Sequence, residues 1–398
     1  MITSKKLEEL KNLFIKYYGE SSEEIRFFTS PGRVNLIGEH VDYCGGLVFP
    51  AALTLSSVAA VRLNNSNTVN LRADDLDGLY SFSLSNTEAG KELKWGNYQA
   101  GVIHWLMDNG YEVRGMDFLF TGDIPFGSGL SSSAAIELTT AVAAASLSAN
   151  YNEKGYDLIN LALIGQKAEH TFSGVNCGIM DQFASAMGKK DNAILLDCAT
   201  LNYKHVPLNL GEYTLILANT CKKHALGASA YNKRREEVSE GLIRMNNILG
   251  TNKENLCDFV EDDYIKAEPS LPADKIRDRV KHVIFENQRV KKAVEILEQG
   301  DLMGFGEMLK EAHISLRDLY EVTGFELDTM FDVACQTEGC IGSRMTGGGF
   351  GGCTVNIVKK SAAEDFIKSV GSAYEAKTGI TPAFYVCDIG DGAREIKI

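Results

Sequence analysis

The sequence predicts an α+β fold, because strand-like and helical segments alternate irregularly along the chain. Runs of β-branched and aromatic residues predict the strands, and longer segments with helical periodicity predict the helices. The 398 residues exceed the usual size of one hydrophobic core, so we expect two domains. Mixed segments give way to long helices near residue 200, which predicts domains at residues 1–200 and 201–398.

The chain opens with an amphipathic segment at residues 1–18, where lysine and glutamate alternate with apolar residues, so we expect a surface helix and not a signal peptide. In the first half we predict strands at 24–28, 54–63, 68–72, 116–120 and 193–196, and helices at 98–107, 130–147 and 157–172. In the second half we predict strands at 213–218, 341–345, 354–358 and 383–387, and helices at 229–249, 272–298 and 362–376.

The composition excludes several classes of function. The sequence has 40 Lys and Arg against 53 Asp and Glu, a formal net charge of −13. This charge argues against broad binding to nucleic acid or to anionic membranes, and no segment reaches the roughly 20 apolar residues of a membrane span. Nine scattered cysteines without a Cys-x-x-Cys pair predict a reduced, cytoplasmic protein.

The most informative segment spans residues 122–135, where a glycine- and serine-rich turn joins a strand to a helix. Gly127 and Gly129 permit positive φ and a close approach to a ligand. The helix start presents unpaired N–H groups that suit phosphate oxygens, and the serines at 131–133 add hydroxyls for phosphate or magnesium. A simple helix cap needs one serine, so the segment favours phosphate binding; it lacks the Gly-Lys-Ser/Thr of a Walker A loop.

A second glycine cluster, at residues 347–352, formally matches Gly-x-Gly-x-x-Gly. A dinucleotide-binding fingerprint opens a helix, whereas the residues at 353–358 are β-branched and strand-like, so we reject that interpretation. Two readings stay open: a tight loop whose bare backbone packs against a ligand or the other domain, and a plain hairpin turn.

Polar residues gather at 31–43, in a stretch otherwise suited to a buried strand. Glu39, His40 and Asp42 offer donors and acceptors that suit several sugar hydroxyls, and a metal site made by the three is an alternative. Each residue also has a structural explanation: Arg33 paired to a carboxylate, His40 in the core, and Asp42 in a turn. Together within twelve residues they favour function.

Two further carboxylates are candidates. Asp181 begins a helical run through residue 187, so it is either an N-cap or a group that orients or deprotonates an attacking hydroxyl. Glu169 lies on the apolar face of the 157–172 helix, where a carboxylate needs a partner. A metal ion and an arginine remain equal alternatives.

With these segments identified, the sequence resembles a known family. Residues 31–42 resemble the galactokinase signature, residues 125–135 the GHMP-kinase phosphate motif, and residues 342–353 the third motif of that superfamily. Residues 178–182 and 223–235 are also similar to galactokinases. The resemblance covers nearly the whole chain in order, which is far more specific than any one glycine pattern.

The resemblance implies ATP-dependent phosphorylation of the anomeric hydroxyl of α-D-galactose to α-D-galactose 1-phosphate, the first step of the Leloir pathway, in a cleft between two α+β domains. Asp181 would be the base or hydroxyl-orienting carboxylate, and Arg33 would stabilise charge on the transferring phosphoryl group. Galactose would be held by Glu39, His40, Asp42, Gly178 and Tyr231. The ATP phosphates would be held by Gly127, Ser128, Gly129, Leu130, Ser131, Ser132 and Ser133, and Mg²⁺ by Ser133 and Glu169. Trp95 is a candidate for the adenine pocket or for the core, and we expect a monomer.

Three positions depart from the family pattern. Val41 replaces a common threonine, Cys44-Gly45 replaces Asn with Asp or Gln, and Ala230 replaces a glutamate. A Cys-Gly pair is typical of N-acetylgalactosamine kinases, which is one alternative function. Another is a non-catalytic regulator that senses galactose and ATP; such proteins can lose residues of the serine run, which is intact here at 131–135. We favour galactose, because residues 178–182 are similar to ordinary galactokinases.

Overall fold

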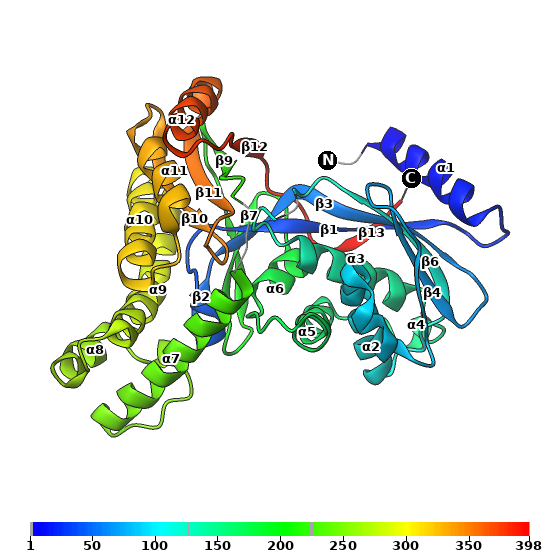
Figure 1. Cartoon of the computed structure of the whole chain (residues 1–398), viewed down its shortest axis with the longest axis horizontal. Coiled ribbons are helices and arrows are strands. Elements are labelled where there is room, and N and C mark those ends of the chain that lie inside the picture. Colours follow the sequence, from blue (N-terminus) through cyan, green and yellow to red (C-terminus); the bar gives the residue numbers. More distant parts are fainter. Residues whose placement is uncertain (1–2, 126, 223–226, 398) are drawn as a thin grey trace.

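The computed structural model describes residues 3–125, 127–222 and 227–397. Figure 1 shows two lobes along the long axis of the molecule, one built on a six-stranded sheet and the other on a four-stranded sheet with long helices. Strands and helices are mixed in both lobes, so the predicted α+β class is confirmed.

The first sheet has the strand order β13-β1-β3-β6-β4-β5. Its strands are β1 (Arg26–Asn35), β3 (Pro50–Leu63), β4 (Thr68–Ala73), β5 (Tyr80–Ser83), β6 (Met116–Gly122) and β13 (Arg394–Ile396). β4 and β6 are parallel, and the other neighbours are antiparallel. β13 follows the second lobe in sequence and pairs with β1, so the chain returns to the first lobe near its end. The division at residue 200 stays a prediction.

Helices cover both faces of this sheet, because successive side chains of each strand point to opposite sides. Helix α1 (Ser4–Tyr18) covers one face, where Leu10 and Phe14 pack against Phe27 and Leu119. The opposite face carries α2 (Asn97–Asp108), α3 (Ser132–Ser146), α4 (Tyr151–Lys154), α5 (Leu158–Ala168) and α6 (Met180–Met187). The small alanine side chains of α3 are buried, which lets this helix lie close to β1 and brings the phosphate loop to the centre of the lobe.

The second lobe contains an antiparallel sheet with the order β10-β11-β9-β12. Its strands are β9 (Tyr213–Asn219), β10 (Cys340–Thr346), β11 (Cys353–Lys359) and β12 (Ala383–Cys387). Its helices are α7 (Gly227–Leu249), α8 (Glu261–Ala267), α9 (Lys275–Glu298), α10 (Leu302–Ser315), α11 (Gly324–Gln336) and α12 (Ala363–Thr378). Helices α11 and α12 pack on one face through Val358 and Phe366, and α9 and α10 contribute to a core on the other through Val355 and Phe305.

The two lobes share an apolar core at their junction. Val34 of β1 and Ala51 of β3 cluster there with Leu217 of β9 and Val355 of β11. A small sheet of β2 (Leu47–Val48), β7 (Asn192–Asp197) and β8 (Tyr203–Pro207) lies beside this junction. The loop after β1 therefore runs directly past the β10–β11 hairpin of the second lobe.

Most predicted elements occur, with shifted ends. The predicted 24–28 strand continues to Asn35, and the predicted 130–147 helix begins at Ser132 because Ser131 adopts a left-handed φ of 60°. The sequence pattern predicts no helix at 302–336, where α10 and α11 lie. Glycines weaken the helical pattern there, yet Gly306 permits close packing, since a Cβ at this position would lie 2.3 Å from the Ile341 carbonyl oxygen.

The described residues also bear on membrane insertion and on redox state. None of the helices within these ranges is both long and apolar enough to cross a membrane. All nine cysteines are free thiols.

Candidate active site

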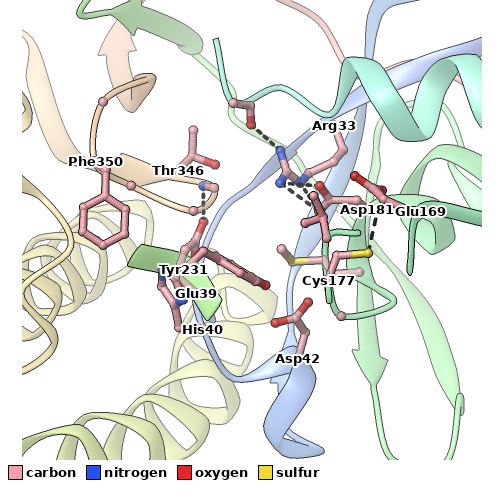
Figure 2. A pocket seen from close by; sticks show the side chains of 18 of the residues that line it. Arg33, Glu39, His40, Asp42, Glu169, Cys177, Asp181, Tyr231, Thr346 and Phe350 are labelled. Carbon is pink, nitrogen blue, oxygen red and sulfur yellow. Dashed lines mark hydrogen bonds and ion pairs between the residues drawn. The ribbon is translucent and has the colours of Figure 1, made fainter. Parts of the chain in front are cut away.

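A cavity of about 610 Å³ opens between the lobes, and Figure 2 shows the side chains that line it. Its walls come from β1 and the following loop, the phosphate loop, the segment before α6, the start of α7 and the loop between β10 and β11. The predicted site residues among the lining residues are Arg33, Glu39, His40, Asp42, Gly127, Gly129, Glu169, Gly178, Asp181 and Tyr231. The remaining predicted residues, Ser128 and residues 130–133, lie outside this lining.

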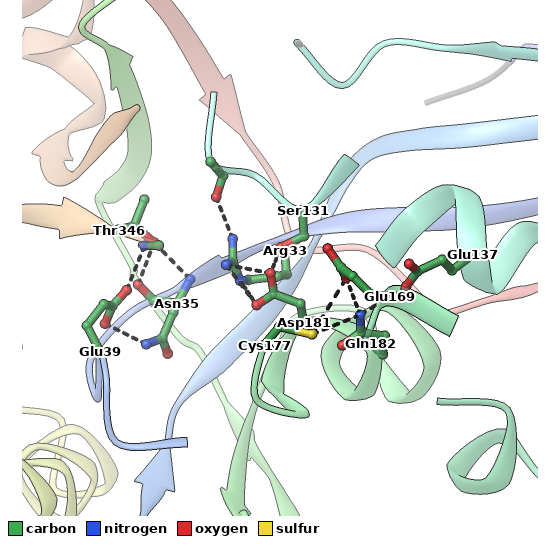
Figure 3. Close-up of polar contacts among 12 residues, drawn as sticks. Arg33, Asn35, Glu39, Ser131, Glu137, Glu169, Cys177, Asp181, Gln182 and Thr346 are labelled. Atoms are coloured by element: carbon green, nitrogen blue, oxygen red, sulfur yellow. Dashed lines mark hydrogen bonds and ion pairs between the residues drawn. The ribbon is translucent and has the colours of Figure 1, made fainter. Parts of the chain in front are cut away.

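The centre of the cavity wall is an ion pair between Arg33 and Asp181 (Figure 3). Arg33 Nε lies 2.9 Å from Asp181 Oδ1, and Nη2 lies 2.9 Å from Oδ2, so the guanidinium and the carboxylate form a two-point contact. Arg33 Nη1 donates to the carbonyl oxygen of Gly129 at 2.6 Å. The Arg33 side chain is 4% exposed and that of Asp181 is 27% exposed, so the carboxylate is the member that a ligand can reach.

Of the two alternatives for Asp181, the helix cap is wrong. Helix α6 begins one residue earlier, at Met180, and its N-cap residue is Ile179. The Asp181 carboxylate instead points to Arg33 and accepts a hydrogen bond of 2.6 Å from Ser131 Oγ. The alternative in which Arg33 pairs with a carboxylate is confirmed, and its partner is the predicted catalytic group.

Glu39 joins the first polar segment to the second lobe. Its side chain is buried and forms an ion pair with Arg344 of β10. Asn35 Nδ2 donates to Glu39 Oε2 at 2.5 Å, and the Gly347 amide donates to Oε1 at 2.9 Å. Burial raises the pKa of Glu39 to about 7, although the charge of Arg344 acts in the opposite direction.

The ring of His40 is buried in an aromatic cluster beside Glu39. The residue has a left-handed φ of 62°, and its Nδ1 lies 2.7 Å from Tyr43 Oη. Its ring centroid lies 5.6 Å from that of Tyr231 and 4.8 Å from that of Tyr320. Burial lowers the pKa of His40 to about 3, so the imidazole is neutral at physiological pH.

The Asp42 carboxylate lies directly against the backbone of Gly178 in the cavity wall. A Cβ at position 178 would lie 1.9 Å from Asp42 Oδ2, so glycine is required where the two segments meet. Burial and, to a smaller extent, the negative charge of Asp181 together raise the pKa of Asp42 to about 6. The metal site considered for Glu39, His40 and Asp42 has no support, because no three His, Cys, Asp or Glu residues in the described ranges are placed to hold a metal ion.

The phosphate loop links β6 to α3. Gly127 and Gly129 have φ of 65° and 74°, as predicted from the need for positive φ. Ser131 is the N-cap residue of α3, but its hydroxyl makes no capping hydrogen bond and is directed to Asp181. Ser128 Oγ donates to the Pro125 carbonyl oxygen, and Leu130 is buried in the shared core. Phe126 lies outside the described residues.

The glycine cluster at 347–352 connects β10 and β11, so the hairpin interpretation is confirmed. The packing interpretation is confirmed as well. A Cβ at Gly347 would lie 3.0 Å from the Gly129 carbonyl oxygen, and one at Gly352 would lie 3.1 Å from that of Ser128. Bare backbone therefore brings the second lobe against the phosphate loop.

Glu169 belongs to a cluster of buried oxygen atoms beside Asp181 (Figure 3). Gln182 Nε2 donates to Glu169 Oε2 at 2.7 Å and to Glu137 Oε2 at 2.9 Å. Burial raises the pKa of Glu169 to about 7, and the nearby Ser133 hydroxyl acts in the opposite direction. In the described part of the chain, no arginine forms an ion pair with Glu169, so the arginine alternative is wrong there.

The chemistry of this cluster fits a magnesium ion. Ser133 offers a hydroxyl and Glu169 a carboxylate, and Mg²⁺ prefers oxygen ligands, of which the protein supplies few and phosphates and water the rest. Glu137 Oε1 is buried and has no hydrogen-bond partner among the described residues. A buried acidic cluster of this kind is stabilised by a cation.

Tyr231 reaches the cavity from α7, as predicted for a sugar-binding residue. Residues 223–226, the first part of the galactokinase-like 223–235 stretch, lie outside the described residues. Cys44 and Gly45 do not belong to the described lining of the cavity, and a Cβ at Gly45 would meet the side chain of Asn255 at 2.5 Å. This pair packs against the protein interior.

Sequence reasoning missed Arg344, Glu137 and Gln182. Each is fully buried, and each holds another polar group in place. Arg344 is a charged residue in the predicted 341–345 strand, and Glu137 is a charged residue in the alanine-rich 130–147 helix, so the sequence indicates that both need a buried partner. For Gln182 the sequence gives no such indication beyond its position next to Asp181.

Three family models match the chain. The galactokinase galactose-binding signature matches residues 12–63, the GHMP kinases N terminal domain matches residues 97–189, and the GHMP kinases C terminal model matches residues 293–376. These matches contain the first polar segment, the phosphate loop with Glu169 and Asp181, and the glycine loop, respectively.

Curated proteins and solved structures show the same likeness over the full length. The galactokinase of Clostridium tetani is 46% identical over 390 residues, with 98% of both chains covered, and that of Bacillus subtilis is 46% identical over 393 residues, with 98% of this chain and 99% of that protein covered. The structure of Lactococcus lactis galactokinase complexed with galactose matches with a TM-score of 0.93 at 39% identity, covering 98% of this chain and 100% of that one. A mevalonate kinase structure, at 18% identity, shares the fold with a TM-score of 0.61 over 91% of this chain and 98% of that chain.

Proposed function

The chain belongs to the galactokinase family of GHMP kinases, and we propose that its cavity transfers the terminal phosphoryl group of ATP to the anomeric hydroxyl of α-D-galactose. The product is α-D-galactose 1-phosphate. The observation that carries this proposal is the position of the Arg33–Asp181 pair, which contacts the phosphate loop on one side and faces the Asp42 side of the cavity on the other.

Galactose binds against the first polar segment. Asp42 and His40 face the cavity, and Tyr231 and the backbone of Gly178 close it from the other segments. Glu39 Oε2 is already contacted by Asn35 and Arg344, whereas Oε1 accepts, among the described residues, only from the Gly347 amide and keeps a second lone pair for a sugar hydroxyl. The mixture of acceptors and a neutral imidazole suits the several hydroxyls of a monosaccharide.

ATP binds along the phosphate loop. The N–H groups at the start of α3 donate hydrogen bonds to the phosphate oxygens, Gly127 and Gly129 allow a close approach through their positive φ, and residues 128–133 line the path of the phosphates. A neighbouring apolar hollow of about 80 Å³ is lined by Trp95, Ile136 and Ser132, which places it next to the same helix start. We assign this hollow to the adenine base.

Ser133 and Glu169 would hold Mg²⁺. Bound there, the ion would supply positive charge beside the phosphates during transfer. Glu169 is positioned by Gln182, and Ser133 by the first turn of α3. The acidic cluster would thereby bind the cation and the helix-start amides would bind the anionic phosphates, in a protein whose net charge is −13.

Asp181 accepts a hydrogen bond from the anomeric hydroxyl and aims its oxygen at the terminal phosphorus of ATP. Arg33 fixes the carboxylate through two hydrogen bonds and adds positive charge where the phosphoryl group passes. Catalysis consists chiefly of positioning and charge neutralisation, which is the usual strategy for phosphoryl transfer.

The two alternative functions have no support. The Cys44-Gly45 pair suggested an N-acetylgalactosamine kinase, but this pair packs away from the described cavity lining. A non-catalytic sensor does not require the Arg33–Asp181 pair or the complete serine run, and this chain has both. The relatives reported above are galactokinases.

We further propose that the enzyme works as a monomer in a reducing compartment, the cytoplasm, without nucleic-acid or membrane partners. All of the proposed site residues come from one chain. The free cysteines and the acidic net charge support these proposals.

The test is ADP release with Mg-ATP and a panel of galactose, N-acetylgalactosamine, glucose and mannose. We expect turnover with galactose to exceed that with the other sugars in kcat/KM. Equal background rates with every sugar would refute the kinase, and a higher kcat/KM for N-acetylgalactosamine would establish that alternative.

A further inference from the structure

The imidazole of His40 has one nitrogen bonded within the protein and one that is left for a ligand. The residue is 4% exposed, and its Nδ1 lies 2.7 Å from Tyr43 Oη. Its Nε2 is buried and makes no hydrogen bond of ordinary geometry with a described residue, although the Gly348 backbone lies near the imidazole, and the residue lines the cavity. Nε2 is therefore the atom through which His40 meets a bound molecule.

The Tyr43 hydroxyl that contacts His40 Nδ1 also contacts a second phenol. Tyr43 Oη lies 2.9 Å from the Oη of Tyr320, which ends a π-helical turn at Leu316–Tyr320 and is fully buried. In the described ranges, Tyr43 is the single hydrogen-bond partner of the Tyr320 hydroxyl. Arg234 Nε donates to the Tyr320 carbonyl oxygen at 2.9 Å, and the His282 ring centroid lies 4.5 Å from the Tyr320 ring, so this phenol is held on both sides.

The number of available protons determines which group donates in the two hydrogen bonds that link Tyr320, Tyr43 and His40. Each hydroxyl carries one proton, and a neutral imidazole carries one. If Tyr320 donates to Tyr43 and Tyr43 donates to His40 Nδ1, both contacts are filled and the imidazole proton lies on Nε2. In the reverse direction, the buried Tyr320 proton has no acceptor among the described residues, and burying an unpaired donor is unfavourable.

A third arrangement is also unfavourable. Tyr43 could accept from both Tyr320 and a protonated His40 Nδ1, but its own proton would then lack an acceptor among the residues described. The order Tyr320 to Tyr43 to His40 is the one that uses every phenolic proton.

We propose that Tyr43 and Tyr320 are positioning residues that hold His40 in the Nε2–H tautomer, so that His40 donates a hydrogen bond to an oxygen of the sugar. This inference rests on the proposed function, because it assigns the sugar to the cavity. Neither tyrosine needs to touch the sugar; both act through the imidazole. Burial, which keeps His40 neutral, supports the count of one imidazole proton.

The surroundings of His40 explain why a donor is useful there. Asp42 and Asp181 are acceptors when ionised, and the Arg33 nitrogens already donate to Asp181 and to Gly129. A sugar hydroxyl both donates and accepts, so a site that contained acceptors alone would leave sugar oxygens unpaired. His40 Nε2–H supplies a donor beside Asp42, in addition to the Gly178 amide and the Tyr231 hydroxyl.

The experiment measures the tautomer directly, by ¹⁵N NMR of protein labelled at its histidines. The two nitrogens of a neutral imidazole resonate at well-separated positions according to which one carries the proton, and His40→Ala identifies the His40 signals. In the ligand-free wild type we expect the proton on Nε2. A proton on Nδ1 would overturn the proposal.

Variants then test the role of the tyrosines. Tyr43→Phe removes the donor at Nδ1, so both His40 resonances should move toward an averaged position and the Kd for galactose should rise roughly tenfold, with the KM for ATP unchanged. Tyr320→Phe should weaken galactose binding less, because Tyr43 then still has His40 as its one acceptor. Tyr264→Phe is the matched control, since Tyr264 is a buried tyrosine of α8 with one hydroxyl hydrogen bond and lies outside the cavity lining.

The same variants separate this inference from the function that underlies it. If His40→Ala leaves the galactose Kd unchanged, the assignment of the sugar to this part of the cavity is wrong. If His40→Ala weakens binding but Tyr43→Phe leaves the resonances and the Kd at the wild-type values, the sugar site stands and the positioning role is wrong.

Discussion

Ser131 Oγ lies 2.6 Å from Oδ2 of Asp181 and donates a hydrogen bond to it. The loop proposed to hold the ATP phosphates thus contacts the carboxylate proposed to hold the sugar hydroxyl. Ser131 reaches this position with a left-handed φ of 60°, a conformation that is costly for a residue other than glycine. The strain is consistent with a functional contact between the two substrate sites.

The first prediction concerns this contact. Ser131→Ala should lower kcat roughly tenfold or more, because a hydrogen bond to a charged group is lost where the carboxylate must be oriented. The neighbouring Ser132→Ala should instead affect mainly the KM for ATP, since Ser132 lines the hollow beside Trp95. Steady-state kinetics of the two variants measures the difference, and matching profiles would contradict the separate roles.

Asp181→Ala should abolish turnover while ATP still binds. The substitution removes the acceptor for the anomeric hydroxyl but leaves the loop backbone in place. Calorimetry with an ATP analogue and an ADP-release assay make the two measurements. Asp318→Ala, which alters an exposed aspartate paired with Arg317, is the control. Substantial residual turnover in Asp181→Ala would exclude Asp181 from the reaction.

Arg33→Ala should raise the barrier to turnover by a few kcal/mol, about 2–4 kcal/mol if the guanidinium contacts the transferring group. The variant also releases Asp181 from its two-point contact. The comparison of kcat with the KM values shows which state loses the interaction, since removing an interaction made only in the transition state lowers kcat. A wild-type kcat would assign Arg33 to structure alone.

Gly178→Ala should weaken galactose binding, because the new Cβ would overlap the Asp42 carboxylate at 1.9 Å. Gly348→Ala is a matched control in the same cavity wall, where the new Cβ would meet the Tyr231 ring at an ordinary 3.5 Å. We expect the KM for galactose to rise more than about tenfold in the first variant and to change less in the second. Equal KM values in the two variants would argue against the assigned contact.

Asp42 predicts a pH dependence of stability in the absence of ligands. Its pKa is raised from 3.8 to about 6, chiefly by burial, so the folded protein binds the proton more readily than the unfolded chain does. Its contribution to the free energy of unfolding is therefore present below about pH 4 and is lost as the pH rises through about 6. Chemical denaturation from pH 4 to pH 7 should show a larger loss of stability in the wild type than in Asp42→Asn, because Glu39 and Glu169, whose pKa values are also raised by burial, titrate in both proteins. A loss of the same size in both would assign it to other groups.

The sequence was sufficient for the fold class, for most strands and helices, and for half of the residues that line the cavity. β-branched runs predicted β9 (Tyr213–Asn219) and β11 (Cys353–Lys359), because both strands are buried and strongly patterned. The helix at 302–315 was not predicted, because its glycines lower the helix propensity of the segment. At Gly306, glycine is needed for close packing against β10.

The contacts between segments were beyond prediction. The hydrogen bond from Gly347 to Glu39 spans 308 positions, and the pair Arg33–Asp181 spans 148. No local pattern encodes which carboxylate an arginine meets across such a distance. For the same reason, the local sequence left a helix cap open as an alternative for Asp181 and gave no role to Arg344, whose partner lies in the other lobe.

The central claim is that one cavity aligns a sugar hydroxyl, Asp181 and the end of a nucleotide held at the start of α3. A crystal structure with galactose, Mg²⁺ and a non-hydrolysable ATP analogue tests it most directly, through the distance from the anomeric oxygen to the terminal phosphorus. We expect the anomeric oxygen to lie about 3–3.5 Å from the terminal phosphorus, with the anomeric hydroxyl hydrogen-bonded to Asp181. Galactose bound outside the cavity, or oriented with its anomeric hydroxyl away from Asp181, would contradict it.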